Sequence, residues 1–108
     1  MAMKPLRQLL DANRKGMIGV EGKGYIYASV LAATTAEVVT VPTGAKYVLF
    51  KSTGTFWANL GAAAAIPSTE VADGSVSLLN PELRGLDGAA TIGLIAPAIC
   101  TVTMEFFS

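Results

Sequence analysis

The sequence predicts an all-β protein, an antiparallel β-sandwich or jelly roll of about seven to eight strands with an extended or short-helical N-terminal arm. Short apolar runs, rich in β-branched and aromatic residues, recur about every 8 to 12 residues with turn residues between them. The last run, residues 100–107, alternates strictly between apolar and polar side chains, as a half-buried strand does. Nothing in the body has the length and periodicity of the helices that connect the strands of an α/β fold.

The chain divides into an N-terminal arm, residues 1–24, and a body, residues 25–108. Residues 5–14 of the arm place three leucines at helical spacing after Pro5, which predicts one short amphipathic helix. A helix of about ten residues is marginal by itself, so it needs a surface on which to dock. The glycines at positions 16 to 24 predict a flexible or tightly turning link to the body.

The body begins with a strand expected at residues 25–32, followed by three apolar runs separated by two turn signals. Pro42 restricts φ and Gly44 accepts a positive φ, so the chain reverses direction there, and Ser52-Thr53-Gly54 marks the second break. This pattern predicts a strand-turn-strand-turn-strand meander. Its three strands are expected at residues 36–41, 46–52 and 55–60.

A long connection, residues 61–74, follows the meander. Gly61 and Pro67 leave room in it for no more than one helical turn. Because such a loop in a small domain is either functional or held by a partner, and its first part is apolar, we interpret it as a contact loop. The remaining expected elements are a strand at residues 75–79, a polar turn at residues 80–88, and a hairpin of residues 90–95 and 100–107.

The 108-residue chain has few charged residues with which to cover its surface. Charged residues make up 15% of it and apolar residues 52%, whereas about 25% charged is usual. Residues 47–50 are apolar at both the odd and the even positions, which point to opposite faces of a strand. Both faces of that strand therefore need to be covered, as in a central strand. We therefore expect part of the outer surface to be buried against other chains, in a homo-oligomer.

The net charge of zero is unevenly distributed. Residues 1–23 carry five basic and two acidic side chains, and the remainder carries three basic and six acidic ones. This separation favours docking of the arm onto an acidic partner such as a neighbouring copy, with a solvated arm as the alternative interpretation. The arm lacks the apolar core of a signal peptide, and the longest uncharged run, residues 88–104, is too short for a membrane span. We expect a soluble protein of cytoplasmic origin with no membrane partner.

The sequence offers little for catalysis or metal binding. It contains no histidine, the commonest general base and metal ligand. Two acidic pairs, Glu70 with Asp73 and Glu82 with Asp87, are the candidates for glycosidase-type chemistry, but acids in turns mostly stay solvated. Cys100 has no histidine to activate it and is expected to be a small buried hydrophobe. We expect no enzymatic activity, no metal and no cofactor.

Aromatic side chains raise two further binding hypotheses. Nucleic-acid-binding modules place aromatics among many Lys and Arg residues, whereas the body of this chain is acidic, so nucleic acid is not the expected partner. Tyr25 and Tyr27 share one strand face, and joined by Trp57 they would form a platform for carbohydrate. The simpler interpretation is that these aromatics fill the core or a subunit interface.

Two stretches, VTVPTGAKYVLFKSTGTFWANLG and DGSVSLLNPELRGLDGAATIGLIAPAICTVTMEFF, resemble small structural proteins of tailed-phage virions, similar in role to capsid decoration or cement proteins. The resemblance lies in V-x-V-P-x-G-A before a Y-V-x-F strand, a short T/S-G turn, D-G-S and N-P corners, and a terminal strand alternating with threonine. It covers roughly residues 25–107. It implies a non-enzymatic β-sandwich coat component, trimeric and present in many copies, whose arm straps neighbouring subunits.

These observations predict a virion protein, made in the host cytoplasm, that binds the major capsid protein or another virion protein. A position in the phage tail or as a head-tail adaptor is one alternative, and a carbohydrate-binding β-sandwich module is another. Partner contacts are expected from apolar residues of the arm and the long loop. They are Leu6, Arg7, Leu9 and Leu10 in the arm, and Ala62, Ala63, Ala64, Ala65 and Ile66 in the loop.

Overall fold

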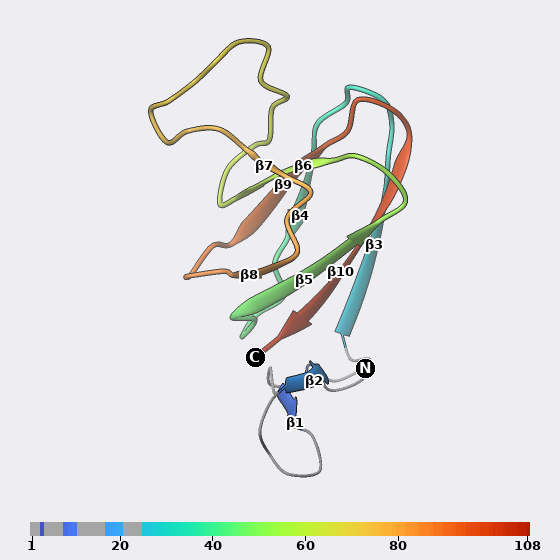
Figure 1. Ribbon diagram of the computed structural model, residues 1–108, viewed down its shortest axis with the longest axis vertical. Helices are drawn as coiled ribbons and strands as arrows, with labels where there is room; N and C mark the ends of the chain where they lie inside the picture. The colour runs from blue at the N-terminus through green and yellow to red at the C-terminus, as the bar shows by residue number, and fades with distance from the viewer. Residues whose placement is uncertain (1–2, 4–7, 11–16, 21–24) are drawn as a thin grey trace.

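The computed structural model describes Met3 and residues 8–10, 17–20 and 25–108. In this part of the chain the regular secondary structure consists of β-strands, which form two antiparallel four-stranded sheets and a separate two-stranded sheet (Figure 1). The expected all-β class is therefore confirmed. The strands are β1 (Gln8–Leu10), β2 (Met17–Val20), β3 (Tyr25–Leu31), β4 (Glu37–Thr40), β5 (Tyr47–Ser52), β6 (Trp57–Leu60), β7 (Leu78–Leu79), β8 (Leu83–Gly85), β9 (Thr91–Ile95) and β10 (Cys100–Phe107).

Successive strands of the body mostly alternate between the two large sheets. One sheet has the order β3-β10-β5-β8 and the other the order β4-β9-β6-β7. Strands that follow one another in the chain thus occupy the same position in the order of their two sheets. These pairs are β3 with β4, β5 with β6, β7 with β8, and β9 with β10. The turns mainly carry the chain from one sheet to the other rather than back along the same sheet.

Two sequence predictions about pairing are therefore wrong. The expected meander does not form, because β4 and β6 both pair with β9 while β5 pairs with β10 and β8. The expected hairpin of β9 and β10 does not form either, because each is an inner strand of a different sheet. A turn signal reverses the chain, but which strand pairs with which is decided by long-range burial of apolar faces.

One core cluster draws residues from both large sheets. The alternating apolar residues of β10, from Cys100 to Phe106, are at most 3% exposed and face this core, as predicted. Ile92 and Leu94 of β9, in the other sheet, are fully buried in the same cluster. Cys100 is a buried free cysteine, also as predicted.

The turn between β4 and β5 has the backbone that its sequence predicts. The Ala45 N–H donates to Pro42 O at 3.1 Å, and Gly44 has a φ of 90°. That region of φ favours glycine because it has no Cβ. At the second predicted break, the Ser52 hydroxyl donates to Gly54 O at 2.6 Å.

The segment between β6 and β9 differs from prediction in two ways. The strand expected at residues 75–79 is reduced to the two residues of β7, and the polar turn expected at residues 80–88 contains β8. All three residues of β8 are exposed, so no burial pattern marks this strand in the sequence. Its antiparallel pairing with β5 holds it in place.

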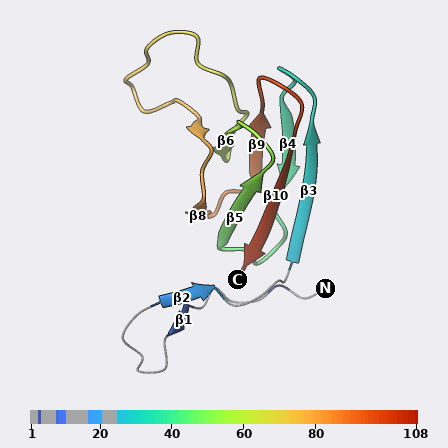
Figure 2. The same ribbon diagram turned by 45° about the vertical axis from the view of Figure 1, so that its right-hand side comes forward.

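The arm contains strands where a helix was expected. β1 pairs antiparallel with β2, so the predicted helix over residues 5–14 is wrong for residues 8–10, and the rest of that range lies outside the described residues. So short a helix is marginal without a docking surface, whereas pairing satisfies the backbone groups locally. β1 and β2 pair with neither large sheet, and they lie beyond the end of the body where β10 finishes (Figure 2).

Candidate functional site: two outer faces and a covering loop

The predicted contact segment, Ala62 to Ile66, begins the long loop that projects from the body between β6 and β7 (Figure 1). The segment is only partly open to a partner. Ala64 is 5% exposed and Ile66 is half-buried, whereas the other three alanines are exposed. The chain therefore uses part of this apolar segment for its own packing.

The segment rests on β9 at Gly93. Ile92 and Leu94 face the core, so alternation along β9 points position 93 away from it. A Cβ at Gly93 would overlap the Ala62 carbonyl oxygen and would lie 2.5 Å from Ala64 N. The loop backbone thus packs against the outer face of the β4-β9-β6-β7 sheet at a distance that only glycine permits.

A hydrogen bond ties the start of the loop to the sheet, and a second one ties the two ends of the loop to each other. At its start, the Gly61 N–H donates to Thr91 O at 2.8 Å. Further on, the Ala65 N–H donates to the hydroxyl oxygen of Ser77 at 3.1 Å, and Ser77 is 8% exposed. The outer part of the loop, which includes the exposed Val71, extends beyond these anchors.

Asp73 organises the backbone near the end of the loop. One of its carboxylate oxygens accepts hydrogen bonds from the Ser75 hydroxyl at 2.6 Å and from the Ser75 N–H at 3.0 Å. These bonds lower the pKa of the Asp73 carboxyl below its ordinary value, and the bond from the Ser75 hydroxyl has the larger effect. A glycosidase acid needs a raised pKa, so this environment does not suit Asp73 for the acid role in the candidate pair with Glu70.

The outer face of the β3-β10-β5-β8 sheet presents aliphatic side chains to solvent. Strand register places Ile26, Leu49 and Leu83 in one row across the sheet, interrupted by Glu105 of β10. Ile26 is 45% exposed and Leu83 is 40% exposed. Val30, on the same face of β3, is 65% exposed. β5 is an inner strand of its sheet, as expected, and its outer face stays partly open in the single chain, so cover by another chain stays a prediction.

Two side chains are nevertheless buried although strand alternation points them away from the core, toward the outer face of their sheet. Ile95 of β9 lies opposite Trp57 of β6 and is 9% exposed. Phe107 at the end of β10 is fully buried. Neither belongs to the core cluster found among the described residues. Each marks a position where the outer side of a sheet is covered.

The structure does not bring together the three aromatic residues of the carbohydrate hypothesis. The rings of Tyr25 and Tyr27 lie 5.4 Å apart beside the core, and Tyr27 meets Phe106 edge-on at 5.1 Å. A 3.5 Å hydrogen bond between the two tyrosine hydroxyls, aided by burial, raises the pKa of Tyr27. Trp57 lies in the other sheet and has outer parity, because Ala58 faces the core. A platform made of all three aromatic residues is therefore not formed.

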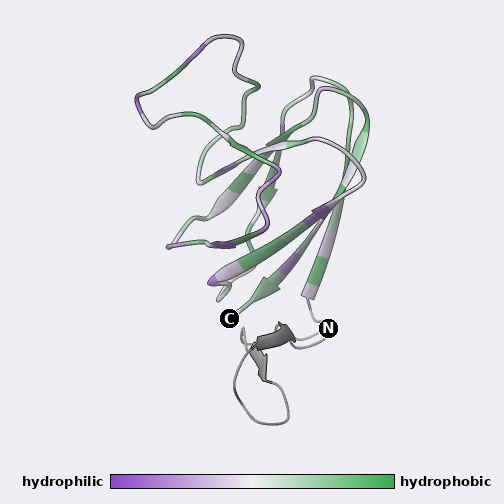
Figure 3. Cartoon of the chain, viewed as in Figure 1, coloured by the Kyte–Doolittle hydropathy of each residue, from purple (hydrophilic) through white to green (hydrophobic). Residues whose placement is uncertain are grey.

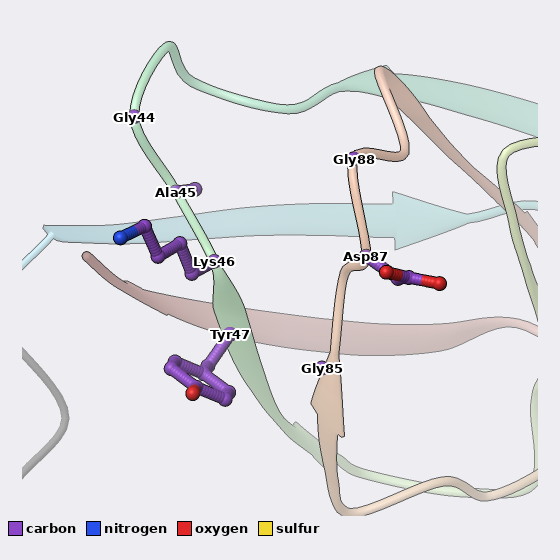
Figure 4. Close-up of a pocket in the computed structure, with 7 residues that line it drawn as sticks. All are labelled: Gly44, Ala45, Lys46, Tyr47, Gly85, Asp87 and Gly88. Atoms are coloured by element: carbon purple, nitrogen blue, oxygen red, sulfur yellow. The ribbon is translucent and has the colours of Figure 1, made fainter.

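A hollow of about 540 Å³ lies between the β4–β5 turn and the loop after β8 (Figure 4). In this view the side chains of Lys46 and Asp87 point in opposite directions. A catalytic or ligand site needs polar groups that converge, and these two do not. Among the described residues, no group of three or more His, Cys, Asp or Glu side chains is placed to hold a metal ion. The lining residues are Gly44, Ala45, Lys46, Tyr47, Gly85, Asp87 and Gly88.

The predicted arm contacts are only partly described. Leu6 and Arg7 lie outside the described residues. Leu9 and Leu10 belong to β1, with a register shift between them against β2. The structure thus places two of the four predicted arm residues in a strand and leaves their partner contacts a prediction.

Sequence reasoning missed the exposed side chains of β3. Ile26 and Val30 were available as contact candidates from strand alternation, since they have the opposite parity to Leu31. The pattern was obscured because Tyr25 to Leu31 is apolar or small at nearly every position. Leu83 carried no such signal, because β8 itself was expected to be a turn.

The chain matches no protein-family model, no curated protein and no solved structure. The part of the chain that the structure describes contains no helix long and apolar enough to cross a membrane. Function is therefore inferred from the surfaces of the molecule itself.

Proposed function

We propose that this chain is a non-enzymatic structural protein of a virion, a capsid decoration or cement protein that binds and stabilises neighbouring capsid subunits. The observation that carries the proposal is the set of exposed aliphatic side chains on the β3-β10-β5-β8 sheet, in a chain with only 15% charged residues. Exposed apolar side chains gathered on one face of a small domain favour association with other proteins. Repetition over a symmetric shell multiplies such contacts through avidity.

The strand order supports a jelly-roll body for this role. Two four-stranded sheets that share one core, with most chain steps crossing between them, favour a face-to-face packing of the sheets. Eight-stranded double-sheet jelly rolls occur in viral capsid proteins and also in lectins. Because a fold hosts many functions, it supports the virion role only together with the exposed surface.

The arm supplies the second expected contact of the assembled protein. Its net positive charge opposes the net negative charge of the body, which favours docking of the arm onto a neighbouring subunit. In this proposal Leu6, Arg7, Leu9 and Leu10 anchor the arm, and the exposed part of Ala62 to Ile66 adds a contact. The protein acts as a homo-oligomer on the capsid, with the trimer as the state implied by the resemblance.

Particle incorporation tests the proposal. We expect a tagged wild-type chain, produced in cells that assemble the virion, to co-purify with particles in a fixed ratio to the capsid protein. Deletion of residues 1–15, which also removes Met3 from its packing on the core, should leave the body folded with a cooperative unfolding transition and abolish incorporation, whereas Thr55→Ala, at an exposed site of the body, should incorporate normally. Absence of the wild-type chain from particles would refute the virion role. Immunogold labelling on tails instead of heads would favour the tail or adaptor alternative.

A further inference from the structure

We infer that β3 joins two copies of this chain edge to edge, antiparallel across a two-fold axis, so that two four-stranded sheets become one sheet of eight strands. The inference adds a specific contact to the proposed assembly role. Its place in a particle rests on that proposed function. It concerns an interaction surface that can be tested on the isolated chain.

Three of the four edge strands of the body have features that oppose pairing with another chain. β4 has four residues and begins with Glu37. β8 has three residues with Arg84 in the middle, and β7 has only two residues. Short length and charge are the means by which natural sheets protect their edges.

β3 has neither form of protection. It is seven residues long, Tyr25–Leu31, and contains no charged residue and no proline. It pairs only with β10, so the N–H and C=O groups on its other side have no strand partner among the described residues. Figure 3 shows β3 in green and pale tones, whereas part of β8 is purple. An open, uncharged edge of this length is a template for another strand.

The side chains of β3 complement those of a second copy of β3. In an antiparallel pair centred on Ala28, Ile26 of each copy lies opposite Val30 of the other, and the two Ala28 residues meet at the axis. The pair then brings into lateral contact the aliphatic side chains that are 45% and 65% exposed in the single chain. No charges oppose each other in this register. The same operation on β8, centred on Arg84, would set two guanidinium groups against each other.

Other strands of this chain fit the open edge less well. β1 has three residues and β2 has four, and they already pair with each other. Among the described strands with a free edge, only β3 itself has the length to match all seven residues. The occupant is therefore the β3 strand of a second copy. The result is a closed dimer, which differs in mass from the trimer that the resemblance implies.

A charge placed at the centre of the contact tests it. Ala28 is exposed, so Ala28→Lys leaves the body folded but sets two ammonium groups opposite each other at the axis. By light scattering we expect a wild-type dimer whose Kd rises about tenfold or more in A28K. The matched control is Val38→Lys on the edge strand β4, where the side chain is 57% exposed and the dimer should persist.

A cysteine at the same position gives an independent readout. Directly opposed residues of antiparallel strands have Cα atoms about 4.5–5.5 Å apart, which is within the range of a disulfide. Cys100, the chain's single cysteine, is buried. Under mild oxidation we expect Ala28→Cys to form a covalent dimer roughly a hundredfold faster than Val38→Cys, because pairing raises the effective thiol concentration to about the millimolar range.

The outcomes separate this contact from the virion role. A wild-type chain that stays monomeric at all concentrations, an oligomer that A28K leaves intact, or equal oxidation rates of A28C and V38C would overturn the β3 contact. A dimer that A28K dissociates and A28C cross-links supports it. A chain that dimerises in this way but never enters particles refutes only the virion role, and a monomeric chain found in particles refutes only the β3 contact.

Discussion

Two regions on the outer faces of the large sheets differ in what covers them: the part of one sheet around Gly93, beside which Val38 on the edge strand is still 57% exposed, and the β3 side of the other sheet, which differs from its buried Phe107. On the β4-β9-β6-β7 sheet, the chain's own loop packs on Gly93, and Ile95 nearby on the same strand is 9% exposed. On the β3-β10-β5-β8 sheet, Ile26 and Val30 remain 45% and 65% exposed. Both regions carry aliphatic residues, so the difference lies in cover and not in composition. A region covered by its own chain stabilises the fold, whereas an open region is available to a partner.

Truncation of one isoleucine on each face tests this comparison most strongly. Ile95→Ala removes a buried side chain and should lower the free energy of unfolding by about 2–4 kcal/mol. Ile26→Ala removes a half-open side chain and should change that free energy by less than about 1 kcal/mol. Urea denaturation, at a concentration where the chain is monomeric, measures both. Equal losses would mean that the two regions do not differ in cover.

Adding a methyl group to one glycine on each face sharpens the comparison. Gly93→Ala forces the loop backbone from the sheet, and we expect a loss of about 1–3 kcal/mol from the resulting overpacking. Gly85→Ala is the control, because its Cβ would lie an ordinary 4.0 Å from the Tyr47 ring and should change stability within about 0.5 kcal/mol. Limited proteolysis should also cut the loop faster in G93A only. A loop equally protected in both variants would contradict the Gly93 contact.

Removing one anchor of the loop should have a smaller effect. Ser77→Ala leaves the Ala65 N–H without its acceptor in a partly buried site, so we expect a loss of about 1 kcal/mol. Hydrogen exchange of the Ala65 amide should accelerate in the same variant. Ser68→Ala, exposed in the same loop, is the control and should change neither quantity. An unchanged exchange rate in S77A would show that this bond does not hold the loop.

The smallest expected effect is on the pH dependence of the loop. Because the folded pKa of Asp73 is lowered, its bonds to Ser75 stabilise the loop above the ordinary carboxyl pKa of about 3.9. That stabilisation is lost as the pH falls through the lowered pKa. NMR titration of the Asp73 carboxyl should show a midpoint below the ordinary value, and Ser75→Ala should raise it. Thr69→Ala should leave the midpoint unchanged, and a midpoint equally unmoved in S75A would contradict the assigned cause.

Local patterns predicted some elements well and others poorly. The alternation from Cys100 to Phe106 identified the core face of β10, and the Gly44 turn was found from its residue types. The apolar segment from Ala62 to Ile66 was found as a loop, but not that Ala64 turns inward, because that depends on Gly93 about thirty residues further along the chain. The helix expected in the arm failed at Gln8–Leu10, because leucines at helical spacing do not exclude strand pairing.

The sequence by itself determined that this is a β protein, where most strands lie, and which side chains of β10 face inward, because a strand's two-residue period is a local property. Only the tertiary structure decided which sheet each strand joins, since antiparallel pairing brings together residues far apart in the chain. It also decided which parts of the outer surface are covered: the loop between β6 and β7 folds back over Gly93, whereas the open edge of β3 has no strand beside it in the described chain.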